Sequence, residues 1–245
     1  MKISAKTDIG RFRENNQDAF DAGVFETGDT WAVVCDGMGG VSGGQVASNI
    51  CVERTVAAIK RGYRKHMTIK AVQNLLNSAI CAANSAVFEE SQKEREYSGM
   101  GTTIVAVIVT KDVAVIAHVG DSRAYVIKDD ITCITKDHSL VQVMVDTGKI
   151  SEEEAKVHPD RNIITRAVGI MSFVDVEFDI VDIDDKCQLL LCTDGLNGSV
   201  EDKDILKVIK ESGDYSAEKL VETAIEKGSR DNITTVLLSA DIQGE

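Results

Sequence analysis

Apolar and polar positions follow two spacings along this chain, and the two spacings predict strands and helices. Short apolar runs rich in β-branched residues end at turn residues, as is typical of β-strands. They predict strands at Lys2–Asp8, Asp18–Phe25, Thr30–Cys35, Thr102–Thr110, Val113–Val119, Ser122–Ile127, Val174–Ile183, Cys187–Cys192 and Ile233–Ser239. Apolar residues three and four apart indicate helices. They predict longer helices at Ser42–Lys60, Val72–Val87, Lys203–Lys210 and Ala217–Lys227, and shorter ones at His138–Val145 and after Ser151.

The order of these elements predicts the fold class. Two helices follow each other near the middle of the chain and two more near the end, and most strands are joined by short turns. This order disfavours βαβ units and predicts an α+β fold, with antiparallel sheets packed under helices. The runs Ile104–Val109 and Val113–Val119 are almost continuously apolar, so we expect both to be buried on two faces. No linker divides the chain, which predicts one domain over residues 1–245.

Composition narrows the class of partner. The 245 residues include 27 Lys and Arg against 40 Asp and Glu, a net charge of −13. This excess disfavours nucleic acid or an anionic membrane as partner, and leaves carboxylates for hard cations. No apolar run is long enough for a membrane span, and the first residues show no secretion signal. The six cysteines form no C-x-x-C pair, so we interpret them as reduced residues of a cytoplasmic protein. The sequence shows no pattern that indicates an oligomer interface, so we expect a monomer.

Acidic residues recur at the ends of the predicted strands. Asp36, Asp121 and Asp194 directly follow apolar strands, whereas Asp18 and Asp231 stand at or just before the start of a strand. Strand ends of one sheet lie near one another, so these acids are expected to converge at one rim. Such carboxylates repel unless cations lie between them, and oxygen ligands favour Mg²⁺, Mn²⁺ or Ca²⁺. A carboxylate between two such ions would place a shared water and yield hydroxide near neutral pH. Taken singly, each Asp-Gly is as well explained as a turn.

Two residues near these acids could contribute other chemistry. Gly37 follows Asp36, and without a side chain its carbonyl can approach an ion closely. Arg13 precedes Asp18 by five residues, and a guanidinium suits bidentate contact with a phosphate. Alternatively, Arg13 could form a surface ion pair with Glu14. The glycine-rich stretch 37–44 lacks the glycine spacing and the Gly-Lys-Ser/Thr of nucleotide-binding loops, so it does not predict a nucleotide site.

Six short motifs then form a recognisable set. They are Arg13 with Asn16-Gln17-Asp18, Asp36-Gly37-Met38-Gly39-Gly40, Gly99-Met100-Gly101-Thr102-Thr103, Gly120-Asp121-Ser122-Arg123, Thr193-Asp194-Gly195-Leu196 and Arg230-Asp231-Asn232-Ile233-Thr234. In order and spacing, from Thr7 to Ser239, the chain resembles bacterial PPM-family protein phosphatases, the type 2C metal-dependent class. The resemblance implies a four-layer αββα sandwich that hydrolyses phosphoserine and phosphothreonine in proteins and opposes a serine/threonine kinase.

The resemblance also implies roles for the acids, as ligands of two Mn²⁺ or Mg²⁺ ions and a third, weaker ion. Asp36 would bridge the two core ions, and Asp194 and Asp231 would complete the first. The Gly37 carbonyl and Asp18 would hold the second. Asp121, with Asp194, would hold the third ion. A hydroxide between the core ions would attack phosphorus in line.

The substrate side of the site is likewise inferred from the resemblance. Arg13 would bind the substrate phosphate, and a flap at about 145–172 would lie beside the site. Met38 stands where some members have a histidine that can donate a proton, so the leaving oxygen would take its proton from water. We favour structural roles for His138, as a helix cap, and for His118, as a satisfied core residue. The alternative function is a non-catalytic metal-binding sensor or adaptor with the same fold.

Overall fold

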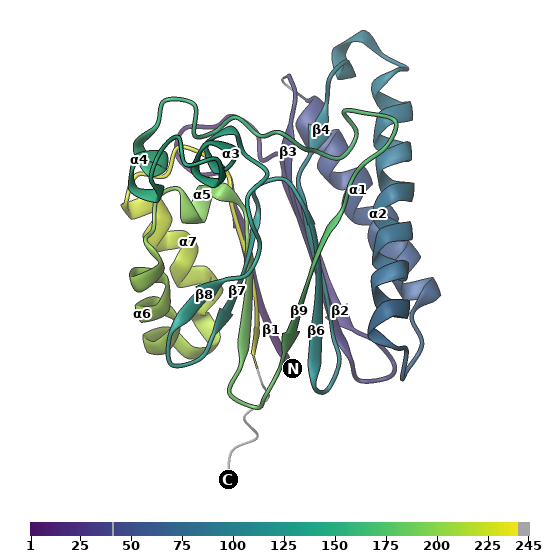
Figure 1. Cartoon of the computed structure of the whole chain (residues 1–245), viewed down its shortest axis with the longest axis vertical. Coiled ribbons are helices and arrows are strands. Elements are labelled where there is room, and N and C mark those ends of the chain that lie inside the picture. The colour runs from purple at the N-terminus through teal and green to yellow at the C-terminus, as the bar shows by residue number, and fades with distance from the viewer. Residues whose placement is uncertain (41, 240–245) are drawn as a thin grey trace.

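Two antiparallel sheets pack face to face, and a pair of helices covers the outer face of each sheet (Figure 1). The computed structural model describes residues 1–40 and 42–239. Val41 and residues 240–245, which belong to the predicted domain of 1–245, lie outside the described residues. The α+β fold predicted from the order of elements is confirmed, and so is the sandwich that the family resemblance implies.

The sheets are built from strands that pair antiparallel throughout. The first has the order β1-β11-β10-β7-β8 and contains β1 (Lys2–Asp8), β7 (Arg123–Ile127), β8 (Ile131–Cys133), β10 (Gln188–Cys192) and β11 (Ile233–Ser239). The second has the order β2-β3-β5-β6-β9 and contains β2 (Asp18–Val24), β3 (Thr30–Met38), β5 (Ile104–Val109), β6 (Val113–Val119) and β9 (Glu177–Asp182). The short strand β4 (Gly101–Thr102) pairs with the end of β3.

The helices fall into two long pairs and several short pieces. The long helices are α1 (Gly43–Gly62), α2 (Ile69–Ser91), α6 (Asp202–Ser212) and α7 (Ser216–Glu226). The short helices are α3 (Leu140–Asp146), α4 (Glu152–Val157) and α5 (Asp194–Asn197), and single 3₁₀ turns lie at Arg95–Tyr97 and Gly213–Tyr215. No helix of the described ranges combines the length and apolar content needed to cross a membrane.

The period of two along the strands divides the core into layers. In β3, Trp31 and Val33 face α1 and α2, whereas Ala32 and Val34 face the other sheet. A third apolar layer lies between the first sheet and the helices α6 and α7. Every residue of β5 is buried, and so is β6 after its first residue. The expectation that these two strands are buried on both faces is therefore confirmed.

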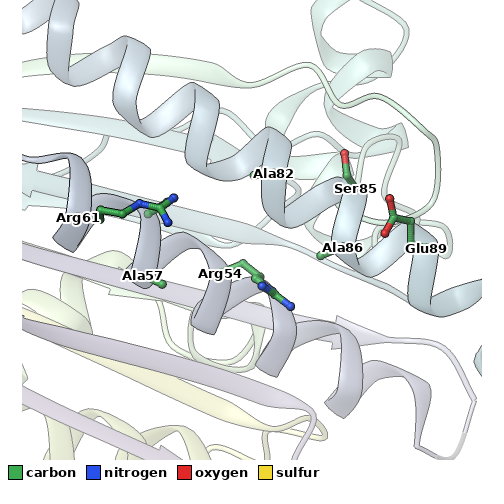
Figure 2. A pocket seen from close by; sticks show the side chains of 8 residues that line it. Arg54, Ala57, Arg61, Ala82, Ser85, Ala86 and Glu89 are labelled. Carbon is green, nitrogen blue, oxygen red and sulfur yellow. The ribbon is translucent and has the colours of Figure 1, made fainter.

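The paired helices α1 and α2 also form a groove on the outer surface. It measures about 560 Å³ and is lined by Arg54, Arg61, Ser85 and Glu89 around four alanines (Figure 2). None of the predicted site residues lines it, so this groove is separate from the acids.

Several predicted boundaries were wrong. Asp36-Gly37 was expected to end the third strand, but β3 continues to Met38 because Gly37 and Met38 pair with β4. The helix expected at His138 starts at Leu140, because the Ser139 side chain caps it by accepting from the Gln142 amide. Strand β9 begins at Glu177 rather than Val174, and the short elements β8 and α5 were not predicted.

Candidate functional site

Two of the predicted acids face each other across a pair of strands. Asp18, the first residue of β2, is the register partner of Asp36 in β3, and directly opposed residues place their side chains on the same face. The Asp36 amide donates to Thr103 Oγ1 at 3.0 Å, and its carbonyl accepts from the Thr103 amide and the Thr102 hydroxyl, both at 2.8 Å. The backbone of Asp36 is thus fixed on two sides.

The first sheet supplies the other three acids. Asp194 begins α5 immediately after β10, Asp231 lies just before β11, and Asp121 lies in the turn between β6 and β7. Because β11, β10 and β7 are neighbours in that sheet, the three acids come to one end of the sandwich. The charge of Asp194 raises the pKa of Asp36, so the acids of the two sheets lie near enough to interact.

The five acids share one electrostatic environment. Burial raises the pKa of Asp36 well above its usual range, and the charges of Asp18, Asp194, Asp121 and Asp231 raise it further. Burial, with added repulsion, also raises the pKa of Asp18 to about 7, of Asp121 to about 7 and of Asp194 to about 6. Ionising such a cluster is costly without compensating cations.

Two carboxylate oxygens in the cluster lack a hydrogen-bond partner. Asp18 is 8% exposed, and its Oδ2 accepts from the hydroxyls of Thr193 at 2.9 Å and Thr234 at 2.7 Å. Its Oδ1 has no partner, and neither has Oδ1 of Asp194. Buried polar atoms are normally satisfied. Unpartnered anionic oxygens among further acids are the donor set that Mg²⁺ or Mn²⁺ accepts, so these residues fit the predicted metals.

Gly37 lies where no side chain has room. A Cβ at this position would come within 2.0 Å of the Gly44 carbonyl oxygen and 2.6 Å of the Gln17 carbonyl oxygen. The Gly37 amide donates to that Gln17 carbonyl at 3.1 Å. Close backbone packing beside Asp36 therefore requires glycine here.

Arg13 reaches the same acids from the N-terminal loop. Its Nη2 lies 2.6 Å from Asp231 Oδ2, and its side chain is about half exposed. The hydrogen bond to Asp231 raises the pKa of Arg13, as do the charges of Asp194 and Asp36. The guanidinium is thus paired with a predicted metal ligand, not with Glu14, and it forms part of the solvent-facing edge of the site.

Neutral residues that hold the acids had no predicted role. Thr193 and Thr234 fix one oxygen of Asp18. Asn232 Oδ1 accepts from the Gln17 amide at 2.8 Å, while its Nδ2 donates to the carbonyls of Ile9 and Asn15, each at 3.0 Å. All three stand within the motifs, directly beside or close to an acid, and this adjacency was the available signal.

The segment 145–172, the predicted flap, is joined to the site through β4. Val168 forms an isolated β-bridge with Thr102, and Thr102 is also the register partner of Gly37. The helix predicted after Ser151 is present as α4, which begins with a capping box between Ser151 and Glu154. Val157 and Ile163 are exposed on this segment, so it presents apolar side chains to solvent.

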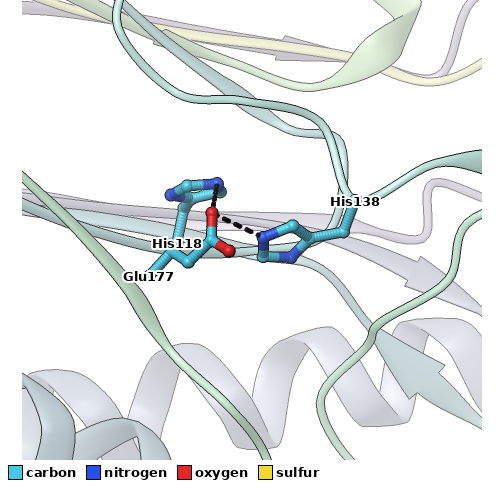
Figure 3. A group of neighbouring side chains, drawn as sticks. All are labelled: His118, His138 and Glu177. Atoms are coloured by element: carbon cyan, nitrogen blue, oxygen red, sulfur yellow. Dashed lines mark ion pairs between the residues drawn. The ribbon is translucent and has the colours of Figure 1, made fainter. Parts of the chain in front are cut away.

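A second cluster of potential ligands lies apart from the five aspartates. His118, His138 and Glu177 each offer an atom within 4.8 Å of the others, the one such group of three in the described residues (Figure 3). The oxygens of the five aspartates form no such group of three within the part of the chain that the structure describes, so an ion held by Asp36, Asp194 and Asp231 would require these side chains to move closer together. His118 is buried, and its Nε2 donates to the Lys136 carbonyl at 2.9 Å, but its Nδ1 has no partner. The expectation of a satisfied core histidine holds for one nitrogen only.

Comparison with known proteins agrees with this geometry. The chain is 36% identical to the serine/threonine phosphatase Stp of Listeria monocytogenes, over 99% of this chain and 97% of the relative. The crystal structure of the phosphatase Stp1 from Staphylococcus aureus is 35% identical, with a TM-score of 0.91 over 98% of this chain and 95% of that chain. The catalytic domain of the phosphatase PstP, solved with two manganese ions, is 32% identical, with a TM-score of 0.85 over 98% of both chains.

The match extends to a whole family. The family description "Protein phosphatase 2C" matches residues 11–237, which include all five acids and Arg13. With this match and relatives that align from end to end, the chain belongs to the protein phosphatase 2C family.

Proposed function

We propose that this protein is a metal-dependent phosphatase that hydrolyses phosphoserine and phosphothreonine in other proteins. The observation that carries the proposal is the cluster of five aspartates around Asp36, of which Asp18 is buried and the other four are half-buried, with the Arg13 guanidinium at its edge. A cluster of anions has no affinity for a phosphate dianion by itself. With dications in place, the same cluster becomes a site for phosphate. Relatives of full length that are named serine/threonine phosphatases support the substrate class.

The proposed roles of the metal ligands are those that the family resemblance implies for these positions. Asp36 would be shared by two core ions, with Asp194 and Asp231 completing the first and the Gly37 carbonyl and Asp18 the second. Asp121, with Asp194, would hold a third, weaker ion. Mn²⁺ or Mg²⁺ would neutralise the carboxylates, polarise the phosphoryl group and bring the pKa of water toward neutrality.

The chain's own residues orient the site and receive the substrate. Arg13 would release Asp231 to bind two phosphoryl oxygens in the bidentate manner that its planar guanidinium allows. The hydroxyls of Thr193 and Thr234 hold one oxygen of Asp18 and leave the other free for a cation. Met38 carries no exchangeable side-chain proton, so the departing serine or threonine oxygen would be protonated by water.

The remaining proposals concern the protein's setting. Residues 1–245 would act as one catalytic domain, a monomer whose substrates are phosphorylated by a serine/threonine kinase. The flap at 145–172 would select among them through its exposed side chains. All six cysteines are free thiols, which supports a reducing compartment and hence the cytoplasm.

Phosphopeptide turnover tests the function. Wild-type protein with Mn²⁺ should release phosphate from phosphoserine and phosphothreonine peptides, and EDTA should abolish the release. Asp36→Asn should be inactive, because it removes the carboxylate shared by the core ions. Asp21→Asn, at a half-exposed position of β2, is the matched control and should remain active. A folded Asp36→Asn protein that is as active as the control would contradict the proposal. A wild-type protein that binds Mn²⁺ without turnover would favour the sensor or adaptor.

A further inference from the structure

His138 forms a reciprocal pair of hydrogen bonds with the turn that carries Asp121. The His138 amide donates to the Gly120 carbonyl at 2.9 Å, and the Gly120 amide donates to Nδ1 of the His138 ring at 3.1 Å. The His138 side chain is almost fully buried. A side chain therefore fixes the residue directly before a predicted metal ligand.

The opposite edge of the His138 ring faces the flap. Because Nδ1 accepts a hydrogen bond, the proton of the neutral ring resides on Nε2. This Nε2 lies 3.2 Å from Glu177 Oε2 (Figure 3). The other oxygen of Glu177, Oε1, accepts from Arg166 Nη1 at 2.9 Å. Arg166 belongs to the flap, and the neighbouring Thr165 amide donates to the His138 carbonyl at 2.7 Å. The ring thus lies between the Asp121 turn and the flap.

We propose that His138 is a positioning residue that couples the flap to the acids of the metal site, through Gly120 on one side and Glu177 with Arg166 on the other. The inference rests on the proposed phosphatase function. It gives His138 a structural role different from the helix cap predicted from sequence, because Ser139 is the cap.

The turn at Gly120 also contacts Thr103, which in turn holds the Asp36 backbone. Gly120 has φ of +108°, and a Cβ there would lie 2.6 Å from Thr103 Cγ2. Thr103 Oγ1 is 2.7 Å from Ser122 Oγ and accepts from the Asp36 amide at 3.0 Å. A displacement of Gly120 would therefore reach both Asp121 and Asp36.

The hydrogen bonds argue against a metal ion at His118, His138 and Glu177. An ion on His138 Nε2 would move the ring proton to Nδ1, where it would face the Gly120 N–H. His118 has its Nε2 engaged with the Lys136 carbonyl. Its ring stacks on that of His138 with centroids 4.7 Å apart. We therefore assign no metal ion to this group of three side chains.

Two substitutions separate the two contacts of His138. In His138→Asn, the amide oxygen lies near the position of Nδ1 and retains the Gly120 contact, while contact with Glu177 is lost. In His138→Gln, the longer side chain reaches toward Glu177 and loses Gly120. His118→Gln, which can still donate to Lys136, controls for substitution of a buried histidine. Glu177→Gln, at a partly exposed residue, provides a second variant on the flap side.

The expected effects differ between these variants. His138→Gln should raise the Mn²⁺ concentration for half-maximal activation about tenfold, the loss expected for one hydrogen bond. It should also speed hydrogen exchange of the Gly120 amide in the metal-free protein. His138→Asn and Glu177→Gln should leave both quantities unchanged. They should instead raise KM about tenfold for phosphorylated casein, but not for p-nitrophenyl phosphate, which is too small to need the flap.

Activity measurements and exchange of the Gly120 amide together distinguish failure of the proposed coupling from failure of the proposed function. Equal effects of His138→Asn and His138→Gln, or effects no larger than those of His118→Gln, would overturn the coupling. Unchanged Gly120 exchange in a folded His138→Gln protein, judged by its melting temperature, would overturn it without reference to activity. If wild type shows no turnover with Mn²⁺, the proposed function fails, while the exchange experiment still tests the link between His138 and Gly120.

Discussion

Asp18→Asn should stabilise the metal-free protein, because Asp18 is held as an anion in a site built for cations. Its pKa is raised from 3.8 to about 7, first by burial and then by the charges of Asp194 and Asp231. An asparagine keeps an oxygen that can accept from Thr193 and Thr234, so the substitution removes the charge while preserving the local hydrogen bonds.

The magnitude and its sign follow from the linkage between ionisation and folding. At pH 8, Asp18 is ionised in both states, and ionisation in the folded state is the more costly one. Each pKa unit corresponds to about 1.4 kcal/mol, so the cost is roughly 4 kcal/mol at most. As the pH falls below 7, the folded protein takes up the proton before the unfolded chain does. The cost falls to roughly half by pH 5.5 and vanishes below pH 4.

Thermal unfolding in EDTA measures this effect. For a chain of this size, 4 kcal/mol corresponds to a melting temperature higher by roughly 8 to 16 °C. The gain of Asp18→Asn should be largest at pH 8 and smaller at pH 5.5. Saturating Mn²⁺ should raise the melting temperature of wild type more than that of the variant.

The matched control is Asp21→Asn on the same strand. Asp21 is half exposed and lies 3.8 Å from Lys60, and such surface pairs contribute little. Its melting temperature should stay near that of wild type at both pH values. A lower melting temperature for Asp18→Asn at pH 8, or a gain equal at both pH values, would refute the electrostatic argument.

Three further substitutions test other parts of the site. Gly37→Ala should lower stability by roughly 2 kcal/mol in thermal unfolding, because its Cβ would collide with a backbone carbonyl of α1; Gly148→Ala, in open space, should cost less. Arg13→Gln should raise KM for p-nitrophenyl phosphate about tenfold, because it removes one charge-assisted hydrogen bond to the phosphate. The melting-temperature gain with Mn²⁺ should persist in this variant. An unchanged KM would exclude phosphate binding by Arg13. Arg123→Lys should cost about 2 kcal/mol in chemical denaturation, because lysine cannot reproduce the two contacts of 2.8 and 2.7 Å with Asp137; equal stability would contradict this.

Regular elements were the most predictable part of the fold. The bounds of β1, β6 and β11 agree with the runs predicted from sequence, because apolar residues end there at turn residues. The end of β3 was mispredicted, since Asp36-Gly37 has the composition of a turn. Pairing with β4, more than 60 residues away, supplies the hydrogen bonds that extend the strand. Local composition contains no record of such a partner.

The acids of the site were predictable, but the groups that hold them were not. Asp18 and Asp194 could be predicted as site residues because each adjoins an apolar run. The hydroxyls of Thr193 and Thr234 reach Asp18 from 175 and 216 residues away. Threonine in a strand is ordinarily a packing residue, so only the tertiary arrangement distinguishes these two. The same holds for the ring of His138, whose partner Gly120 is 18 residues away.

The pairing of β1 with β11 determines when the first sheet can be completed during synthesis. Strand β11 lies between β1 and β10 and follows directly after Asp231, so the last described strand closes the first sheet and brings in a predicted ligand. During synthesis, strands β2, β3, β5 and β6 of the second sheet emerge long before β11 does. A nascent chain can therefore form these strands of the second sheet while β1 still lacks its partner strand β11. Dephosphorylation would therefore begin only once residues 229–239 have left the ribosome, and unfinished chains could not remove phosphate from other proteins.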